Sequence, residues 1–107
     1  MKELSMNESA ERLIDKYRGC LVGGAVGDAL GYAIEFMSEE AVKKRYGECG
    51  ITDYELVGGV AQISDDTQMT LFTANGLLLG TTRDMTRGIM GKYANYIAGC
   101  YKDWFRT

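Results

Sequence analysis

Residues 14–31 read IDKYRGCLVGGAVGDALG, and the spacing of apolar residues and glycines in this stretch decides the fold class. Apolar side chains recur three and four residues apart, the spacing of one helix face, at Ile14, Tyr17, Leu21 and Ala25. Glycines repeat every four residues on a neighbouring line from Gly19 to Gly31, which leaves room for another backbone to approach closely. We therefore expect a helix that starts near Asn7 or Ser9, both favourable N-cap residues, and buries the apolar line.

Three further helices are predicted downstream. They span residues 38–46, 64–79 and 84–105. Ser38 is expected to cap the first of them and Gly47 to stop it, and Gly80 is expected to end the second. The connection over residues 47–63 is long and rich in glycine, with a short strand around residues 54–57 as one interpretation. Since no two segments alternate convincingly between apolar and polar residues, the fold class is predicted to be all-α.

Length, composition and charge restrict the class of protein. The 107 residues suffice for one small domain with a modest core, and we expect a flexible start over residues 1–8. The net charge is −3 and the largest basic cluster is residues 43–45, so nucleic-acid binding is not expected. Two carboxylates, Asp28 and Glu35, interrupt the most apolar stretch, which argues against a membrane span. The three cysteines have no metal-site spacing, and reduced thiols in a cytoplasmic protein are the simplest interpretation.

The sequence contains no histidine. The most common general base and the usual nitrogen ligand for zinc are therefore both missing. Any catalysis would have to use carboxylates, hydroxyls, thiols, lysine, tyrosine or a bound metal ion.

The tetrad Ser64-Asp65-Asp66-Thr67 is the most informative candidate for chemistry, because two adjacent carboxylates repel each other and need compensation. In one interpretation Ser64 caps a helix and both carboxylates lie at the positive end of its dipole. In a second interpretation water simply screens exposed charges. In a third, the carboxylate and hydroxyl oxygens bind a hard divalent cation.

Two acidic residues upstream, Asp28 and Glu35, each have a structural and a functional interpretation. Asp28 continues the apolar line of the first helix, either as a hydrogen-bonded structural acid or as a group that supports a metal site. Glu35 would share its face if the helix continued, and its apolar neighbours would shelter it as a general base or a movable ligand. It could equally be a surface acid at a helix end.

Aromatic residues gather near the carboxyl end, where helical spacing favours a core and a binding surface is the alternative. They are Tyr93, Tyr96, Tyr101, Trp104 and Phe105.

Three segments together resemble the ADP-ribosylglycohydrolases, which include the dinitrogenase reductase-activating glycohydrolases. Residues 18–31 resemble the first helix of that family with its Gly-Asp-Ala signature. Glu35-Phe36 falls where the family has a Glu-Phe pair, and residues 64–69 are similar to the start of its metal-binding helix. The sequence Tyr-Lys-Asp-Trp at residues 101–104 is a weaker similarity.

The resemblance implies an all-α bundle around two divalent ions, usually Mg²⁺ and sometimes Mn²⁺. It implies Ser64, Asp65 and Asp66 as metal ligands and Glu35 as a movable ligand or a substrate-positioning acid near the ions. In the reaction we expect from this site, Asp66 or Glu35 accepts the proton of water. Asp28 and Thr67 would support the site. The implied substrate is an ADP-ribosylated protein or a small molecule containing ADP-ribose, and the implied reaction is hydrolysis of a glycosidic bond.

The family draws its remaining ligands from an Asp-x-Asp-Thr motif near its carboxyl terminus, and this sequence has none. We therefore expect residues 1–107 to form a partial domain that lacks its carboxyl-terminal part. Such a partial domain is expected to self-associate or to need another chain. An inactive remnant or interaction module is the first alternative function. A metal-dependent phosphohydrolase that converged on an Asp-Asp pair is the second.

Overall fold

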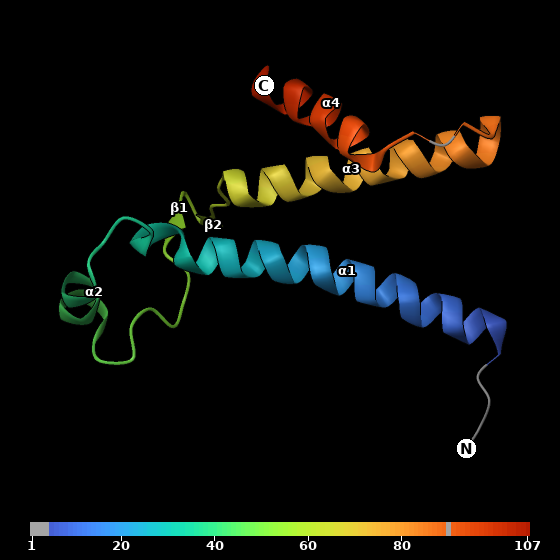
Figure 1. The fold of residues 1–107 in the computed structure, drawn as a ribbon. Helices are drawn as coiled ribbons and strands as arrows, with labels where there is room; N and C mark the ends of the chain where they lie inside the picture. Colours follow the sequence, from blue (N-terminus) through green and yellow to red (C-terminus); the bar gives the residue numbers. More distant parts are fainter. Residues whose placement is uncertain (1–4, 90) are drawn as a thin grey trace. The chain divides into compact units, whose positions relative to one another are not determined.

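The computed structural model describes residues 5–89 and 91–107, which form helices and one small hairpin (Figure 1). The chain divides into two compact units, Met1–Ile63 and Ser64–Thr107, and each is treated by itself. The first unit holds α1, the 3-10 turn η1, α2 and the strands β1 and β2, and the second holds α3 and α4. The prediction of an all-α fold is confirmed, because the only strands are two residues long among the described residues.

Helix α1 (Met6–Gly31) begins earlier than the sequence predicted. Ser5 is the N-cap: its side chain accepts from the backbone N–H of Glu8 at 3.2 Å, and its own N–H donates to Glu8 Oε2 at 2.9 Å. This reciprocal capping box satisfies two donors that the first turn would otherwise leave unpaired. Asn7 and Ser9 therefore lie inside the helix rather than at its cap. Of the predicted flexible start, residues 1–4 lie outside the described residues, and Ser5 onward forms the cap and first turn.

The apolar line of α1 is buried only in its second half, so the predicted stripe is wrong for the first half. Ile14 is 47% exposed and Tyr17 is 61% exposed, whereas Leu21 and Ala25 are half-buried. Among the described residues of its own unit, no helix packs along the first half. The glycine line also remains open, because a Cβ added at any of its positions would meet no described atom of that unit within 4 Å.

Helix α1 is followed by η1 (Tyr32–Ile34) and then by α2 (Glu39–Tyr46), whose ends match the prediction. Ser38 accepts a hydrogen bond from the N–H of Ala41 at 3.2 Å, and Lys43 pairs with Glu39 at 2.6 Å within the helix. Gly47 takes a positive φ of 91° and its N–H donates to the carbonyl of Lys43, which ends the helix. The short-range signals of caps and charges were sufficient here.

The glycine-rich connection forms a small antiparallel hairpin of β1 (Leu56–Val57) and β2 (Val60–Ala61). Gly58 and Gly59 form its turn with φ values of 59° and 80°. Positive φ at both central residues is the property of hairpin turns that favours glycine. The strand suggested by the sequence is thus present from Leu56, and its partner follows directly.

Helix α3 (Asp65–Arg87) starts after the N-cap Ser64, as predicted, but continues past Gly80. It ends at Gly88, which adopts a left-handed φ of 65° and donates its N–H to the carbonyl of Asp84. Gly80 instead lies buried inside the helix, where an added Cβ would be 2.9 Å from the ring of Tyr96. The glycine permits close packing and does not stop the helix.

Helix α4 (Tyr93–Phe105) is therefore shorter than the predicted helix over residues 84–105. Its first predicted turns belong to α3, and Met85 in that segment is 81% exposed. Helix α4 folds back against α3 within the second unit (Figure 1), and Cys100 is the residue it buries most completely. Asn75 of α3 donates to the sulfur of Cys100 at 3.6 Å.

The aromatic residues of α4 are divided between contact and exposure, so the expected aromatic core forms only in part. The Tyr101 hydroxyl hydrogen-bonds the Thr73 hydroxyl, and the indole N–H of Trp104 donates to Gln68 Oε1 at 3.0 Å. Phe105, in contrast, is 85% exposed.

No single helix among the described residues combines the length and hydropathy of a membrane span. The segment of α1 and η1 together with α2 has the required length and composition, but the two parts are bent by 92° relative to each other.

Candidate metal and substrate site

The candidate site is the first turn of α3, where four consecutive polar residues differ sharply in their surroundings. Ser64 is half-buried and its hydroxyl accepts a hydrogen bond from the N–H of Asp66 at 3.2 Å. Asp65 and Asp66 are exposed, whereas Thr67 is buried. The extended backbone of Ser64 places these groups directly at the start of the helix.

This geometry confirms that Ser64 is a helix cap. The bond to Ser64 uses the backbone N–H of Asp66 and not its carboxylate, so both aspartate carboxylates are presented at the helix start. The positive end of the helix dipole stabilises each of them by about 0.3–1 kcal/mol. The dipole therefore lowers the electrostatic cost of holding two adjacent negative charges without any cation. Capping and exposure, two of the three interpretations from the sequence, are both present.

The oxygen donors at this turn fit a hard divalent cation in kind. Mg²⁺ prefers carboxylate and hydroxyl oxygens and usually keeps several water ligands when only one or two carboxylates bind it. A hydroxyl oxygen has two lone pairs, so acceptance of one N–H does not prevent Ser64 from acting as a ligand. In number the donors are few: within residues 5–89 and 91–107, no three carboxylate or thiol groups come together in a metal-binding arrangement.

Asp28 and Glu35 belong to the first unit, on either side of η1. Asp28 is half-buried in the last turn of α1, consistent with a hydrogen-bonded acid. Glu35 is the C-cap of η1 and is exposed, and its neighbour Phe36 is 95% exposed. The expected apolar shelter around Glu35 is therefore wrong. Because α1 ends at Gly31, the two acids also do not share the face of one continuous helix.

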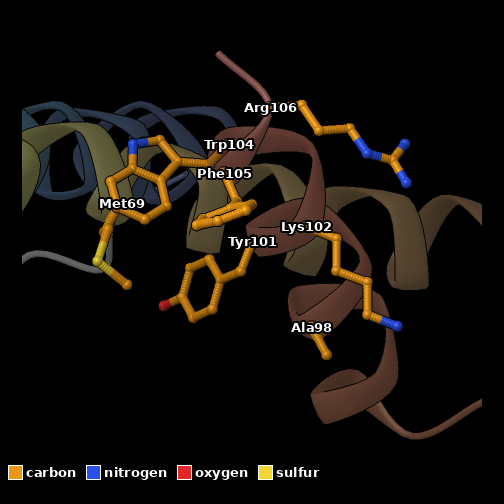
Figure 2. A pocket seen from close by; sticks show the side chains of 7 residues that line it. All are labelled: Met69, Ala98, Tyr101, Lys102, Trp104, Phe105 and Arg106. Atoms are coloured by element: carbon orange, nitrogen blue, oxygen red, sulfur yellow. The ribbon is translucent and has the colours of Figure 1, made fainter.

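An open cavity of about 440 Å³ lies beside the second turn of α3, between α3 and the end of α4 (Figure 2). Figure 2 shows the rings of Tyr101 and Trp104 on the same side as Met69, while Lys102 and Arg106 extend away from them. Its lining residues are Met69, Ala98, Tyr101, Lys102, Trp104, Phe105 and Arg106. The cavity offers apolar and aromatic contact rather than a cluster of charges.

Sequence reasoning missed the contact that joins this cavity to the candidate turn. Gln68 follows Thr67 directly, and its side chain accepts from the indole of Trp104, so α4 braces the first two turns of α3. The two residues are 36 positions apart, and no local pattern in the sequence connects them.

A second polar cluster that the sequence did not reveal lies at the end of α2. The Tyr46 hydroxyl donates to Glu55 Oε1 at 2.9 Å, and Arg45 pairs with the same oxygen at 3.5 Å. The Arg45 guanidinium also stands 5.3 Å from the centre of the Tyr46 ring. Desolvation, and next the hydrogen bond to Glu55, raise the pKa of the Tyr46 phenol above its ordinary value. This cluster ties α2 to the segment before the hairpin.

Comparison with known proteins assigns the chain. The family model described as ADP-ribosylglycohydrolase matches residues 9–107. The chain is 35% identical over 77 residues to the ADP-ribosyl-[dinitrogen reductase] glycohydrolase of Rhodospirillum rubrum. The matched segment covers 66% of this chain and 25% of that protein. It is 36% identical over 70 residues to an uncharacterised protein of Archaeoglobus fulgidus, covering 60% of this chain and 22% of that protein.

No solved structure matches the chain with significance. The matched region spans about a quarter of the length of the curated relatives. The family model nevertheless covers both units, including Asp28, Glu35 and the first turn of α3. The chain belongs to the ADP-ribosylglycohydrolase family.

Proposed function

We propose that this chain contributes part of a metal-dependent site that hydrolyses the glycosidic bond between ADP-ribose and a modified protein side chain or small molecule. The observation that supports the proposal most strongly is the pair of adjacent carboxylates in the first turn of α3, in a chain that belongs to this family. There Asp65 and Asp66 are exposed side by side at a helix start. The Rhodospirillum rubrum relative, by its name, acts on ADP-ribosylated dinitrogen reductase.

In this proposal Ser64, Asp65 and Asp66 hold Mg²⁺ or Mn²⁺, and Thr67, which is buried, supports the turn. The metal, when bound, supplies Lewis acidity toward oxygen atoms of the substrate and of water. The site needs more oxygen ligands than this turn provides, because carboxylate number largely sets the affinity for hard cations.

The proposed reaction adds water across the bond between the ribose carbon and its acceptor. The carboxylate of Asp66 or Glu35 accepts a proton from the attacking water, the oxygen bonds the ribose carbon, and the acceptor leaves with a proton. The transition state has the character of an oxocarbenium ion, as in other glycosidic hydrolysis. Glu35 suits a movable role, because it is exposed at the end of η1. Asp28 supports the site from the last turn of α1.

Isothermal titration of the chain with MgCl₂, and then with ADP-ribose, tests the proposal directly. Saturable heats for both, lost in Asp65→Ala, are expected if the turn binds metal and substrate. Asp103→Ala is a matched control, because it removes an exposed carboxylate from α4. Full helicity by circular dichroism with no heat in either titration would overturn the proposal for this chain.

That negative result would favour the first alternative, an inactive remnant or an interaction module. A second alternative, a metal-dependent phosphohydrolase, makes a different prediction. It would show metal heats and would cleave a simple phosphate ester such as p-nitrophenyl phosphate, yet would leave ADP-ribosylated substrates intact. The Asp-Asp pair by itself is common to both chemistries, so the substrate decides between them.

A further inference from the structure

The first half of α1 carries an apolar line that no described helix of its unit covers. Ala10, Ile14 and Tyr17 form the exposed part of this line, and Leu21, at its carboxyl-terminal end, is half-buried. We call these four residues the α1 seam. Their spacings of four, three and four residues are those of a helix that packs on another along a narrow stripe. Ile14 and Tyr17, at the middle of the seam, are 47% and 61% exposed.

The flanks of the α1 seam are not alike. On one side stand an acid and a base, Glu11 and Arg18, separated by seven residues and hence nearly superposed around the helix axis. On the other side stand two apolar residues, Leu13 and Cys20, both exposed. Neither Glu11 nor Arg18 takes part in an ion pair with another described residue, since those pairs are Lys43–Glu39 and Arg45–Glu55.

We propose that the α1 seam binds the α1 seam of a second copy of this chain in an antiparallel pair. If Ile14 of each copy faces Tyr17 of the other, the same register places Ala10 opposite Leu21. Ala10, which is small, then meets the larger Leu21, which suits close packing. The opposite directions of the two helices bring Glu11 of each copy to within roughly 3 Å, along the axis, of Arg18 of the other.

The pairing therefore forms two identical ion pairs related by a two-fold axis, with Leu13 beside Cys20 on the opposite flank. Glu11 precedes Arg18 along the same flank of the helix. In a parallel pair each residue would meet its own copy, whereas in an antiparallel pair Glu11 of one copy meets Arg18 of the other. This charge complementarity selects a second copy as the occupant of the seam. The inference does not depend on the proposed catalytic function, because the first turn of α3 has no part in it.

Sedimentation equilibrium over a series of protein concentrations tests the pairing. The wild-type chain is expected to dimerise reversibly. Glu11→Lys and Arg18→Glu each replace two attractions by two repulsions, and each is expected to weaken dimerisation by about tenfold or more. The double variant Glu11→Lys/Arg18→Glu exchanges the two charges and is expected to regain the wild-type dissociation constant.

Two controls alter charge elsewhere on α1. Asp15→Lys and Arg12→Glu change the net charge as the test variants do but lie off the seam, so they are expected to leave dimerisation nearly unchanged. A second measurement does not depend on weakened binding: in Arg18→Lys, carbodiimide is expected to couple the new amine to Glu11 of the other copy, identified by mass spectrometry. A wild-type chain that stays monomeric, single variants that behave like the controls, or a double variant that does not recover would each overturn the pairing.

Discussion

The Cα atom of Ile97 on α4 lies 2.8 Å from the position that a Cβ would occupy at Gly76 on α3. Real Cβ atoms do not approach another atom so closely, so the two helices pack at a distance that only glycine allows. Gly80, one turn further along α3, is covered in the same way by the rings of Tyr93 and Tyr96. The packing of α4 on α3 therefore depends on the absence of a side chain at Gly76 and Gly80.

Gly76→Ala is expected to destabilise the second unit although alanine favours helices. Helix propensity alone would stabilise α3 by about 1 kcal/mol, but α4 must move away from the new methyl group, which typically costs about 1–3 kcal/mol. Gly99→Ala is the matched control, because its position on α4 has no described atom within 4 Å and only the propensity gain applies. Urea unfolding followed by circular dichroism and by the fluorescence of Trp104 measures both. Equal stability of the two variants would contradict the close packing.

Asp65→Ala and Asp66→Ala are each expected to abolish binding of Mg²⁺ while helicity is nearly retained. The carboxylates are exposed and Ser64 still caps α3, so each variant loses only its favourable dipole interaction of about 0.3–1 kcal/mol. Titration calorimetry gives the metal affinity, and chelation with EDTA should reproduce the loss in the wild-type chain. Either variant binding Mg²⁺ as the wild-type chain does would remove that residue from the ligand set.

Glu35→Gln is expected to reduce turnover of an ADP-ribosylated substrate more than it reduces metal affinity. The amide retains the size and hydrogen-bonding capacity of the side chain but cannot accept the proton of water. Glu40→Gln makes the same chemical change at another exposed position and should leave turnover unaltered. The assay follows release of ADP-ribose in a protein with a complete site. Unchanged turnover in Glu35→Gln would exclude it from the catalytic set.

The raised pKa of Tyr46 predicts a loss of stability at alkaline pH. The folded chain holds the phenolic proton more tightly than the unfolded chain does, because of desolvation and the hydrogen bond to Glu55. The stabilising contribution is therefore complete below the unfolded value of about 10 and is lost as pH rises through the higher folded value.

Absorbance of tyrosinate against pH measures the effect, with Tyr46→Phe identifying the signal of this residue. Glu55→Gln removes the neighbouring negative charge, and we expect the pKa of Tyr46 to fall toward its ordinary value. An unchanged titration of Tyr46 in that variant would show that Glu55 does not cause the shift.

The sequence alone determined the features that depend on neighbours within a few residues. Ser38 and Gly47 were recognised as the cap and stop of α2, and Ser64 as the cap of α3, because capping bonds join residues two to four positions apart. The adjacency of Asp65 and Asp66 likewise marked the turn as a candidate site, and left capping, exposure and metal binding as open interpretations. The all-α class followed from periodicity over whole helices.

Only the tertiary structure decided which glycine ends a helix and which allows two helices to meet. Gly80 and Gly88 carry the same local signal, but the rings of α4 cover Gly80, whereas Gly88 adopts the left-handed conformation that stops α3. The contact of Trp104 with Gln68 and that of Tyr46 with Glu55 also join segments that no local pattern links. Such pairs form only when the chain folds back on itself, because packing acts between residues that are distant in sequence.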